Sequence, residues 1–241
     1  MFPTIRTMST PTSPDRLLLF DIDGTLLSAG RGGLQAFVTA LTEVFGTAGD
    51  VERYRFEGKL DPLIVTELMR GAGVEEAVIE RRRPEALSLY LERLEAYLSA
   101  VSPTLKPGVR ELVENVASSP RATVALLTGN VRRGAQIKLG ASGLWRHFRF
   151  GAFGDDGPRR VDLGPVALER AAALTGRTYS GSECVVIGDS RADVECGRAI
   201  GARVVAVATG RTTREELEEA GADVALPDFA DLSRTLEAIF C

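Results

Sequence analysis

Two aspartates, Asp21 and Asp23, are the strongest candidates for reactive side chains in this chain of 241 residues. They follow the apolar run Leu17–Phe20, which has the character of a short buried strand, and Gly24 then ends that run. Side chains two positions apart on an extended chain point the same way, so the two carboxylates can share one site. Two unpaired carboxylates in one site are electrostatically costly unless a cation is bound there. The pair therefore predicts a metal-dependent reaction centre at the carboxyl end of a strand, where open α/β sheets bind ligands.

Further polar residues follow two other predicted strands. They come directly after the strand or at the start of the next helix: Thr128, Gly129 and Asn130 after residues 123–127, and Asp189 and Asp193 after residues 184–187. A basic pair, Arg159-Arg160, precedes a helix that begins near Asp162. Because the carboxyl ends of parallel strands meet at one edge of a sheet, we expect these residues to converge on the aspartate pair.

These residue types suit phosphoryl transfer. A carboxylate can attack phosphorus and form an aspartyl-phosphate. Mg²⁺ prefers oxygen ligands and binds through one or two carboxylates together with substrate phosphate. A hydroxyl group and a cationic side chain can hold the remaining phosphoryl oxygens. A second carboxylate near the leaving group can donate a proton and later activate water.

The order of the predicted elements indicates an α/β fold. Beyond residue 103, apolar runs with strand character alternate with segments of helical periodicity, which is typical of a parallel sheet covered on both faces. The strands predicted in this region are 123–127, 148–153, 184–187, 204–207 and 223–226. We therefore expect a doubly wound, Rossmann-like parallel sheet as the core of the protein.

Residues 28–103 contain no convincing strand and are predicted to be a block of helices. Helical periodicity covers residues 34–45, and Asp61-Pro62 has the composition of a helix start, with the aspartate as N-cap and the proline as first residue. A third helical region spans about residues 74–100, in which Pro84 marks a break or a new start. The predicted organisation is a flexible leader (1–15), a catalytic core (16–27 and 104–241) and an inserted helical cap (28–103).

Composition limits the partners that we expect. The net charge is −4 with acidic and basic residues interspersed, so nothing favours nucleic-acid binding. No apolar run approaches the ~20 residues that span a membrane, and residues 1–15 lack the apolar segment of a signal peptide. The three cysteines show no metal-like spacing, which favours a cytoplasmic, reduced protein. The sequence leaves the oligomeric state open between monomer and dimer.

Three motifs of this sequence resemble three of the four motifs of the haloacid dehalogenase (HAD) superfamily, in the same order. They are Asp21-Ile22-Asp23-Gly24-Thr25-Leu26, Leu127-Thr128-Gly129-Asn130, and Ile187-Gly188-Asp189-Ser190 with Asp193. The first motif is highly specific, and the resemblance covers the chain from about Arg16 to its C-terminus. The helical insert resembles the cap of phosphoglycolate phosphatase-like members.

The resemblance implies a role for each matching residue. Asp21 would be the nucleophile and Asp23 the general acid and base. Asp21, the Asp23 main-chain carbonyl and Asp189 would bind Mg²⁺, with Asp193 supporting the metal shell. Thr128, with Gly129 and Asn130, would bind the phosphoryl group.

The third motif of the family departs from its usual form here, because no lysine lies between residues 153 and 162. We expect Arg160 to supply the cation instead, with Arg159 and then Lys138 as the alternatives. Arginine is a good bidentate partner for phosphate, although it is not equivalent to lysine. Lys59 lies in a predicted cap loop, where it is either a substrate contact or a solvated charge.

The resemblance implies a Mg²⁺-dependent phosphomonoester hydrolase that acts on a small phosphorylated metabolite through an aspartyl-phosphate. Phosphoglycolate is the substrate that the resemblance suggests. Two alternatives stay open: a sugar phosphomutase with the same fold, and a catalytically weak phosphate-binding or regulatory domain, which the change at Arg160 allows. Asp23 argues against a dehalogenase, because halide departure needs no proton donor.

Overall fold

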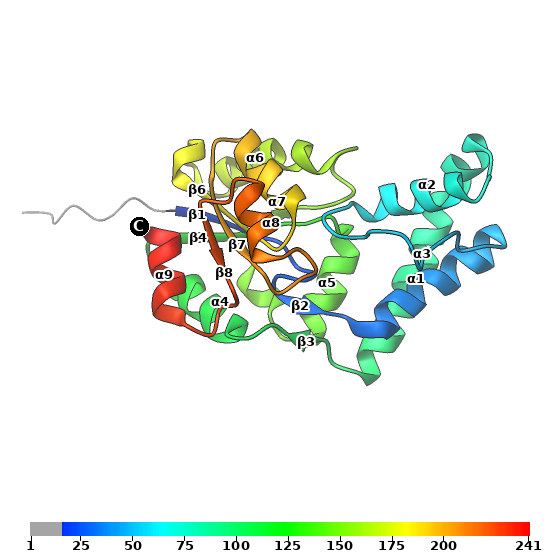
Figure 1. The fold of residues 1–241 in the computed structure, drawn as a ribbon, viewed down its shortest axis with the longest axis horizontal. Coiled ribbons are helices and arrows are strands. Elements are labelled where there is room, and N and C mark those ends of the chain that lie inside the picture. The colour runs from blue at the N-terminus through cyan, green and yellow to red at the C-terminus, as the bar shows by residue number, and fades with distance from the viewer. Residues whose placement is uncertain (1–15) are drawn as a thin grey trace, which may run out of the picture.

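A parallel sheet of six strands forms the centre of the computed structural model, which describes residues 16–241 (Figure 1). The predicted leader, residues 1–15, lies outside the described residues. In spatial order the strands are β5 (Gly151–Ala152), β4 (Ala122–Leu127), β1 (Arg16–Phe20), β6 (Cys184–Gly188), β7 (Arg203–Val207) and β8 (Val224–Leu226). Because β1 lies between β4 and β6, the segments that follow these three strands meet at one edge of the sheet.

Helices cover both faces of the sheet, as predicted for a doubly wound α/β core. The alternation of side chains along β1 explains the two layers, since Leu18 and Phe20 enter one hydrophobic cluster and Leu17 and Leu19 enter another. The first cluster includes residues of α4 (Val109–Ser118), α5 (Arg132–Ala141) and α9 (Leu232–Phe240). The second includes residues of α6 (Leu163–Thr175) and α7 (Arg191–Ala199). The short helix α8 (Arg214–Glu219) packs beside β8.

Three further helices project to one side of the sheet and form the cap (Figure 1). They are α1 (Gly30–Phe45), α2 (Asp61–Gly71) and α3 (Glu76–Ala100), and they share a hydrophobic cluster of their own. Ile137 of α5 also packs in this cluster, so α5 links the cap to the sheet layer. The two connections between core and cap run side by side as the antiparallel pair β2 (Leu27–Ser28) and β3 (Thr104–Leu105).

Several local expectations differ from the structure. The helix α3 is continuous through Pro84, because the packing of buried residues on both sides of it, Ile79 and Tyr90 among them, outweighs the lost hydrogen bond. The strand predicted at 148–153 shrinks to β5, because only Gly151 and Ala152 pair with β4.

Candidate active site

The site forms where the chain leaves β1, β4 and β6. The Asp21 backbone N–H donates to the Ile187 carbonyl at 2.9 Å, which holds the residue after β1 against the end of β6. The Thr128 N–H donates to the Ala152 carbonyl at 3.0 Å and fixes the segment after β4 in the same way. These backbone bonds continue the sheet by one residue, so the side chains of Asp21 and Thr128 are carried by rigid backbone at the sheet edge.

Three buried carboxylates converge at this edge. Asp21, Asp189 and Asp193 each offer an oxygen atom, and these atoms all lie within 4.8 Å of one another. Asp189 accepts a hydrogen bond of 2.7 Å from the Thr25 hydroxyl. Asp193 accepts from both the backbone N–H and the hydroxyl of Ser190, at 3.0 and 2.6 Å, in a capping box at the start of α7.

The guanidinium of Arg160 lies against this carboxylate cluster. Arg160 Nη2 donates to Asp21 Oδ1 at 2.8 Å, to the Leu127 carbonyl at 3.2 Å, and to Asp193. The Arg160 side chain is only 7% exposed. Arg159, by contrast, is 73% exposed and pairs with Asp162 at 2.7 Å. Of the three candidates for the missing third-motif cation, Arg160 is therefore the one that the structure brings to Asp21; its catalytic role stays a prediction.

The cluster carries more negative than positive charge. Burial raises the pKa of Asp21 to about 6, although Arg160 opposes the shift. Burial, followed by the charge of Asp21, also raises the pKa of Asp189 well above its usual range. Three carboxylates against one guanidinium suit a bound divalent cation, and their oxygen atoms are the ligands that Mg²⁺ prefers.

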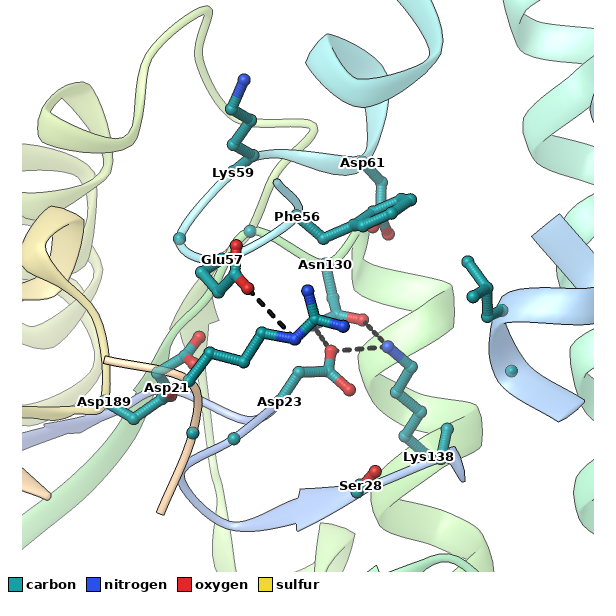
Figure 2. A pocket seen from close by; sticks show the side chains of 18 of the residues that line it. Asp21, Asp23, Ser28, Phe56, Glu57, Lys59, Asp61, Asn130, Lys138 and Asp189 are labelled. Atoms are coloured by element: carbon teal, nitrogen blue, oxygen red, sulfur yellow. Dashed lines mark hydrogen bonds and ion pairs between the residues drawn. The ribbon is translucent and has the colours of Figure 1, made fainter. Parts of the chain in front are cut away.

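The second aspartate of the first motif has different surroundings. Asp23 is 45% exposed, and its Oδ2 accepts hydrogen bonds from Lys138 Nζ at 2.6 Å and from Asn130 Nδ2 at 2.8 Å (Figure 2). Its side chain is not part of the carboxylate cluster. Lys138 was the last alternative for the cation beside Asp21, and the structure places it against Asp23 instead. Burial disfavours the ammonium, but Asp23, Tyr90 and Asp61 outweigh this effect and raise the pKa of Lys138.

The segment after β4 also makes contact with the cap. Thr128 is fully buried, and its hydroxyl oxygen accepts from Asn130 Nδ2 at 3.0 Å. The Gly129 carbonyl accepts from the Asp61 N–H at 2.8 Å. A Cβ at Gly129 would lie 2.0 Å from the Lys59 carbonyl oxygen, so only glycine permits the cap loop to approach this closely.

Asp61 does not cap its own helix, so that prediction is wrong. Leu60 precedes α2 and Asp61 is its first residue. The Asp61 carboxylate instead accepts the Val131 N–H at 2.9 Å, at the start of α5. The reason is the close contact between cap loop and core, which brings the unpaired N–H groups of α5 within reach. Burial raises the pKa of Asp61 to about 6, against the opposing charge of Lys138.

A cavity of about 440 Å³ lies between the cap and the sheet edge (Figure 2). Its lining includes Asp21, Asp23, Asp189 and Asn130 from the core, and Phe37 and Phe56 from the cap. Lys59 also lines it, but its ammonium points away from Asp21 and Asp23 (Figure 2), pairs with Glu67 and lies 4.6 Å from the Tyr54 ring centre. Of the predicted core residues, the structure thus brings Asp21, Asp23, Gly129, Asn130, Arg160 and Asp189 to the cavity. Thr128 and Asp193 are buried and contact the lining residues Asn130 and Arg160. The charge of Lys59 is directed elsewhere.

Comparison with known proteins identifies this arrangement. A HAD-hydrolase-like family model matches residues 162–232. A phosphoglycolate phosphatase of Pseudomonas syringae pv. tomato is 28% identical over 222 residues, which cover 90% of this chain and 78% of that protein. A hydrolase of known structure from Pseudomonas syringae is 25% identical with a TM-score of 0.67, and the match covers 94% of this chain and 100% of that one. The chain thus resembles the haloacid dehalogenase superfamily in sequence and in fold.

These matches support a phosphatase of the phosphoglycolate phosphatase-like type, as the sequence motifs predicted. The fold of CbbY from Rhodobacter sphaeroides, solved in complex with xylulose-(1,5)bisphosphate, is also similar. It gives a TM-score of 0.69 at 22% identity, and the match covers 90% of this chain and 96% of that chain. The predicted α/β core with a helical cap is therefore confirmed as a HAD fold. Among residues 16–241, no helix combines the length and apolar character that a bilayer crossing needs.

Sequence reasoning missed two parts of this site. It gave Asp61 only a local role as the N-cap of its own helix, and it gave Lys138 only as a substitute beside Asp21. The signal for Lys138 was weak but present, since it is a lysine between Ile137 and Leu139 on a helix that directly follows a motif. Its burial, at 7% side-chain exposure, could not be read from periodicity alone.

Proposed function

We propose that this protein hydrolyses a small phosphorylated metabolite in a Mg²⁺-dependent reaction through an aspartyl-phosphate. The placement of Asp21 carries the proposal. Its carboxylate is buried at the sheet edge, oriented by Arg160 and within reach of two further carboxylates. A buried, oriented carboxylate beside a cation site and a cavity is the arrangement that nucleophilic attack on phosphorus requires.

The proposed reaction has two steps, and each step includes one proton transfer. In the first, an Asp21 oxygen forms a bond to phosphorus while the bond to the leaving oxygen breaks, and Asp23 gives its proton to that oxygen. In the second, water attacks phosphorus and gives a proton to the Asp23 carboxylate, so Asp21 and inorganic phosphate are released. The Thr128 hydroxyl, with Gly129 and Asn130, is proposed to bind phosphoryl oxygens. Arg160 orients the nucleophile and, with its positive charge, favours an anionic substrate.

The proposed metal ligands are Asp21, the Asp23 main-chain carbonyl and Asp189, with Asp193 supporting this set. When bound, Mg²⁺ would offset the repulsion between an anionic nucleophile and an anionic substrate. The excess of negative charge in the carboxylate cluster supports this assignment.

The proposed substrate is a metabolite small enough for a cavity of about 440 Å³. Phosphoglycolate is the first compound to test, since the relative from Pseudomonas syringae pv. tomato is named a phosphoglycolate phosphatase.

We also propose that residues 28–103 form a separate cap domain on the core of residues 16–27 and 104–241. The hydrophobic cluster shared by α1, α2 and α3 supports this division. A cytoplasmic location is proposed on the free cysteines Cys184, Cys196 and Cys241.

Phosphate release tests the proposal. The wild-type protein is expected to release phosphate from 4-nitrophenyl phosphate and from phosphoglycolate or another metabolite on a panel, with Mg²⁺ present. Asp21→Asn keeps the size of the side chain but lacks the nucleophilic carboxylate, so no turnover is expected. Thermal melting of both proteins controls for folding. Equal rates for the two proteins would overturn the assignment of Asp21, and isomerisation of a sugar phosphate without net phosphate release would favour a phosphomutase.

A further inference from the structure

The side chains of Asp23, Asn130 and Lys138 form a closed triangle of hydrogen bonds. Lys138 Nζ donates to Asp23 Oδ2 and to Asn130 Oδ1, both at 2.6 Å. Asn130 Nδ2 donates to the same Asp23 oxygen at 2.8 Å (Figure 2). The two donors come from different places in the chain, since Asn130 follows β4 and Lys138 lies in α5.

Lys138 is buried although it is a lysine, and lysine is almost never buried unless it is paired. Its ammonium has the two oxygen partners of the triangle, and the Tyr90 phenol and the Asp61 carboxylate of the cap are its other close charged or polar neighbours. The donors of Lys138 are thus directed at protein atoms. This arrangement suits a residue that acts through Asp23 and not one that binds a phosphoryl group itself.

Both donors of the triangle contact the same oxygen atom of Asp23. Among residues 16–241, Asp23 Oδ1 accepts no hydrogen bond, while Oδ2 accepts two. Two donors on one oxygen fix the rotation of the carboxyl group and leave the other oxygen available to a ligand in the cavity. A carboxyl group that carries its proton on Oδ1 can still accept both hydrogen bonds on Oδ2.

We propose that Lys138 is a positioning residue that, together with Asn130, anchors Asp23 Oδ2 and so aims Oδ1 at the leaving-group oxygen of the substrate. The inference rests on the proposed function, because it assigns a partner to the proposed acid and base. It goes beyond that function by predicting which substrates depend on Lys138. Leaving groups that must be protonated as they depart need a well-aimed Asp23, whereas good leaving groups do not.

The test compares two substrates through kcat/KM, which reports the steps up to departure of the leaving group. The variant is Lys138→Met, which removes the charge and keeps an unbranched chain of similar length. For an alkyl phosphate that the wild type hydrolyses, kcat/KM is expected to fall about 10²-fold. For 4-nitrophenyl phosphate, whose leaving group needs no proton, it is expected to change less than about 3-fold.

A second lysine offers a matched control. Lys106 lines the same cavity, but its ammonium donates to the Thr209 carbonyl at 2.5 Å and makes no bond to Asp23. Lys106→Met is expected to change kcat/KM for both substrates by the same factor. The double variant Lys138→Met with Asp23→Asn should be no slower on the alkyl phosphate than Asp23→Asn alone, because the two residues act as one unit.

The outcomes separate this inference from the proposed function. A wild type without phosphatase activity, or an active Asp21→Asn variant, would overturn the function and the inference with it. An active wild type with Lys138→Met lowered equally on both substrates would overturn the positioning role alone, as would an additive double variant. Urea unfolding of each variant identifies any loss that comes from instability.

Discussion

Asp21 and Asp23 are two residues apart, yet the fold gives them opposite surroundings. Asp21 is 7% exposed, contacts Arg160 and lies among other carboxylates. The Asp23 side chain is 45% exposed and has a lysine of its own. One motif thus supplies a buried, crowded carboxylate and a more open, paired one. In the proposed mechanism it is the environment, and not the residue type, that suits Asp21 to attack on phosphorus and Asp23 to proton transfer.

The balance of charge differs between the two places as well. Around Asp21 three carboxylates share one guanidinium, whereas Asp23 pairs with one ammonium. We therefore expect a bound cation beside Asp21 and not beside Asp23. This difference leads to four predictions, and the first three treat the surroundings of Asp21 and Asp23 separately.

The largest effect is expected from substituting the two aspartates themselves. Asp21→Asn should lower kcat by more than about 10⁴-fold on every substrate, because no nucleophile remains. Asp23→Asn should lower kcat/KM by about 10²- to 10⁴-fold on alkyl phosphates and far less on 4-nitrophenyl phosphate. Steady-state kinetics on both substrates measure this. An Asp23→Asn variant that loses both substrates equally would remove the distinction between the two aspartates.

The two cationic side chains, Arg160 and Lys138, should differ in their contribution to stability. Arg160→Met leaves two buried carboxylates without their partner, which is expected to lower the free energy of unfolding by roughly 3 to 5 kcal/mol. Lys138→Met leaves a carboxylate that water can reach, so about 1 kcal/mol is expected there. Urea unfolding at neutral pH without metal measures both values.

Arg160→Lys is the control for the arginine, since it keeps the charge and loses the planar group. We expect it to recover most of the stability and only part of the activity. Equal losses of stability from Arg160→Met and Lys138→Met would show that the burial of the paired carboxylate does not determine how much unfolding free energy is lost.

The stabilisation of the protein by metal should depend on the carboxylates around Asp21 and not on Lys138. Mg²⁺ at about a hundred times its dissociation constant is expected to stabilise the wild type by about 2.7 kcal/mol. Asp189→Asn should lose this gain, yet be more stable than the wild type without metal, since it removes a buried charge from the cluster. Lys138→Met should keep the gain. Melting in Mg²⁺ and in chelator tests this, and loss of the gain in Lys138→Met would contradict the separation.

Much of this arrangement could be predicted from the sequence because it follows from chain order. Apolar runs that end in Asp21, Thr128 and Asp189 predict parallel strands, and the ends of parallel strands converge. Arg160 was predicted from its position before α6, without any knowledge of its contacts. The acidic cluster and its guanidinium thus need only topology and motif order.

The Asp23 side could not be predicted in this way, because it depends on how a helix is rotated and how the cap sits on it. Lys138 lies 115 positions from Asp23, and nothing in the sequence indicates that its ammonium faces inward. The sequence at Asp61 matches the local pattern of a helix N-cap, but a contact between cap and core directs its side chain to the start of α5. In both cases tertiary packing, and not the local sequence pattern, decides where the side chain points.

The smallest effect concerns Asp61, a buried carboxylate that has no cation in hydrogen-bond contact among residues 16–241. Burial raises its pKa to about 6, so the folded state favours the protonated form. This contribution to stability is complete below about pH 4 and is lost as the pH rises through 6. Asp61→Asn resembles the protonated form at every pH. It should therefore be more stable than the wild type by roughly 2 to 3 kcal/mol at pH 8, with little difference at pH 4.

Asp61→Ala separates the charge from the hydrogen bond that Asp61 accepts from the Val131 N–H. Asparagine can keep that bond through its carbonyl oxygen, whereas alanine leaves the N–H unpaired at a cost of about 1 to 3 kcal/mol at all pH values. Urea unfolding between pH 4 and pH 8 should thus show a pH-dependent difference for Asp61→Asn, and for Asp61→Ala the same dependence displaced by a constant loss. If wild type and Asp61→Asn instead change in parallel with pH, Lys138 stabilises the Asp61 carboxylate without direct contact, and its influence extends beyond Asp23.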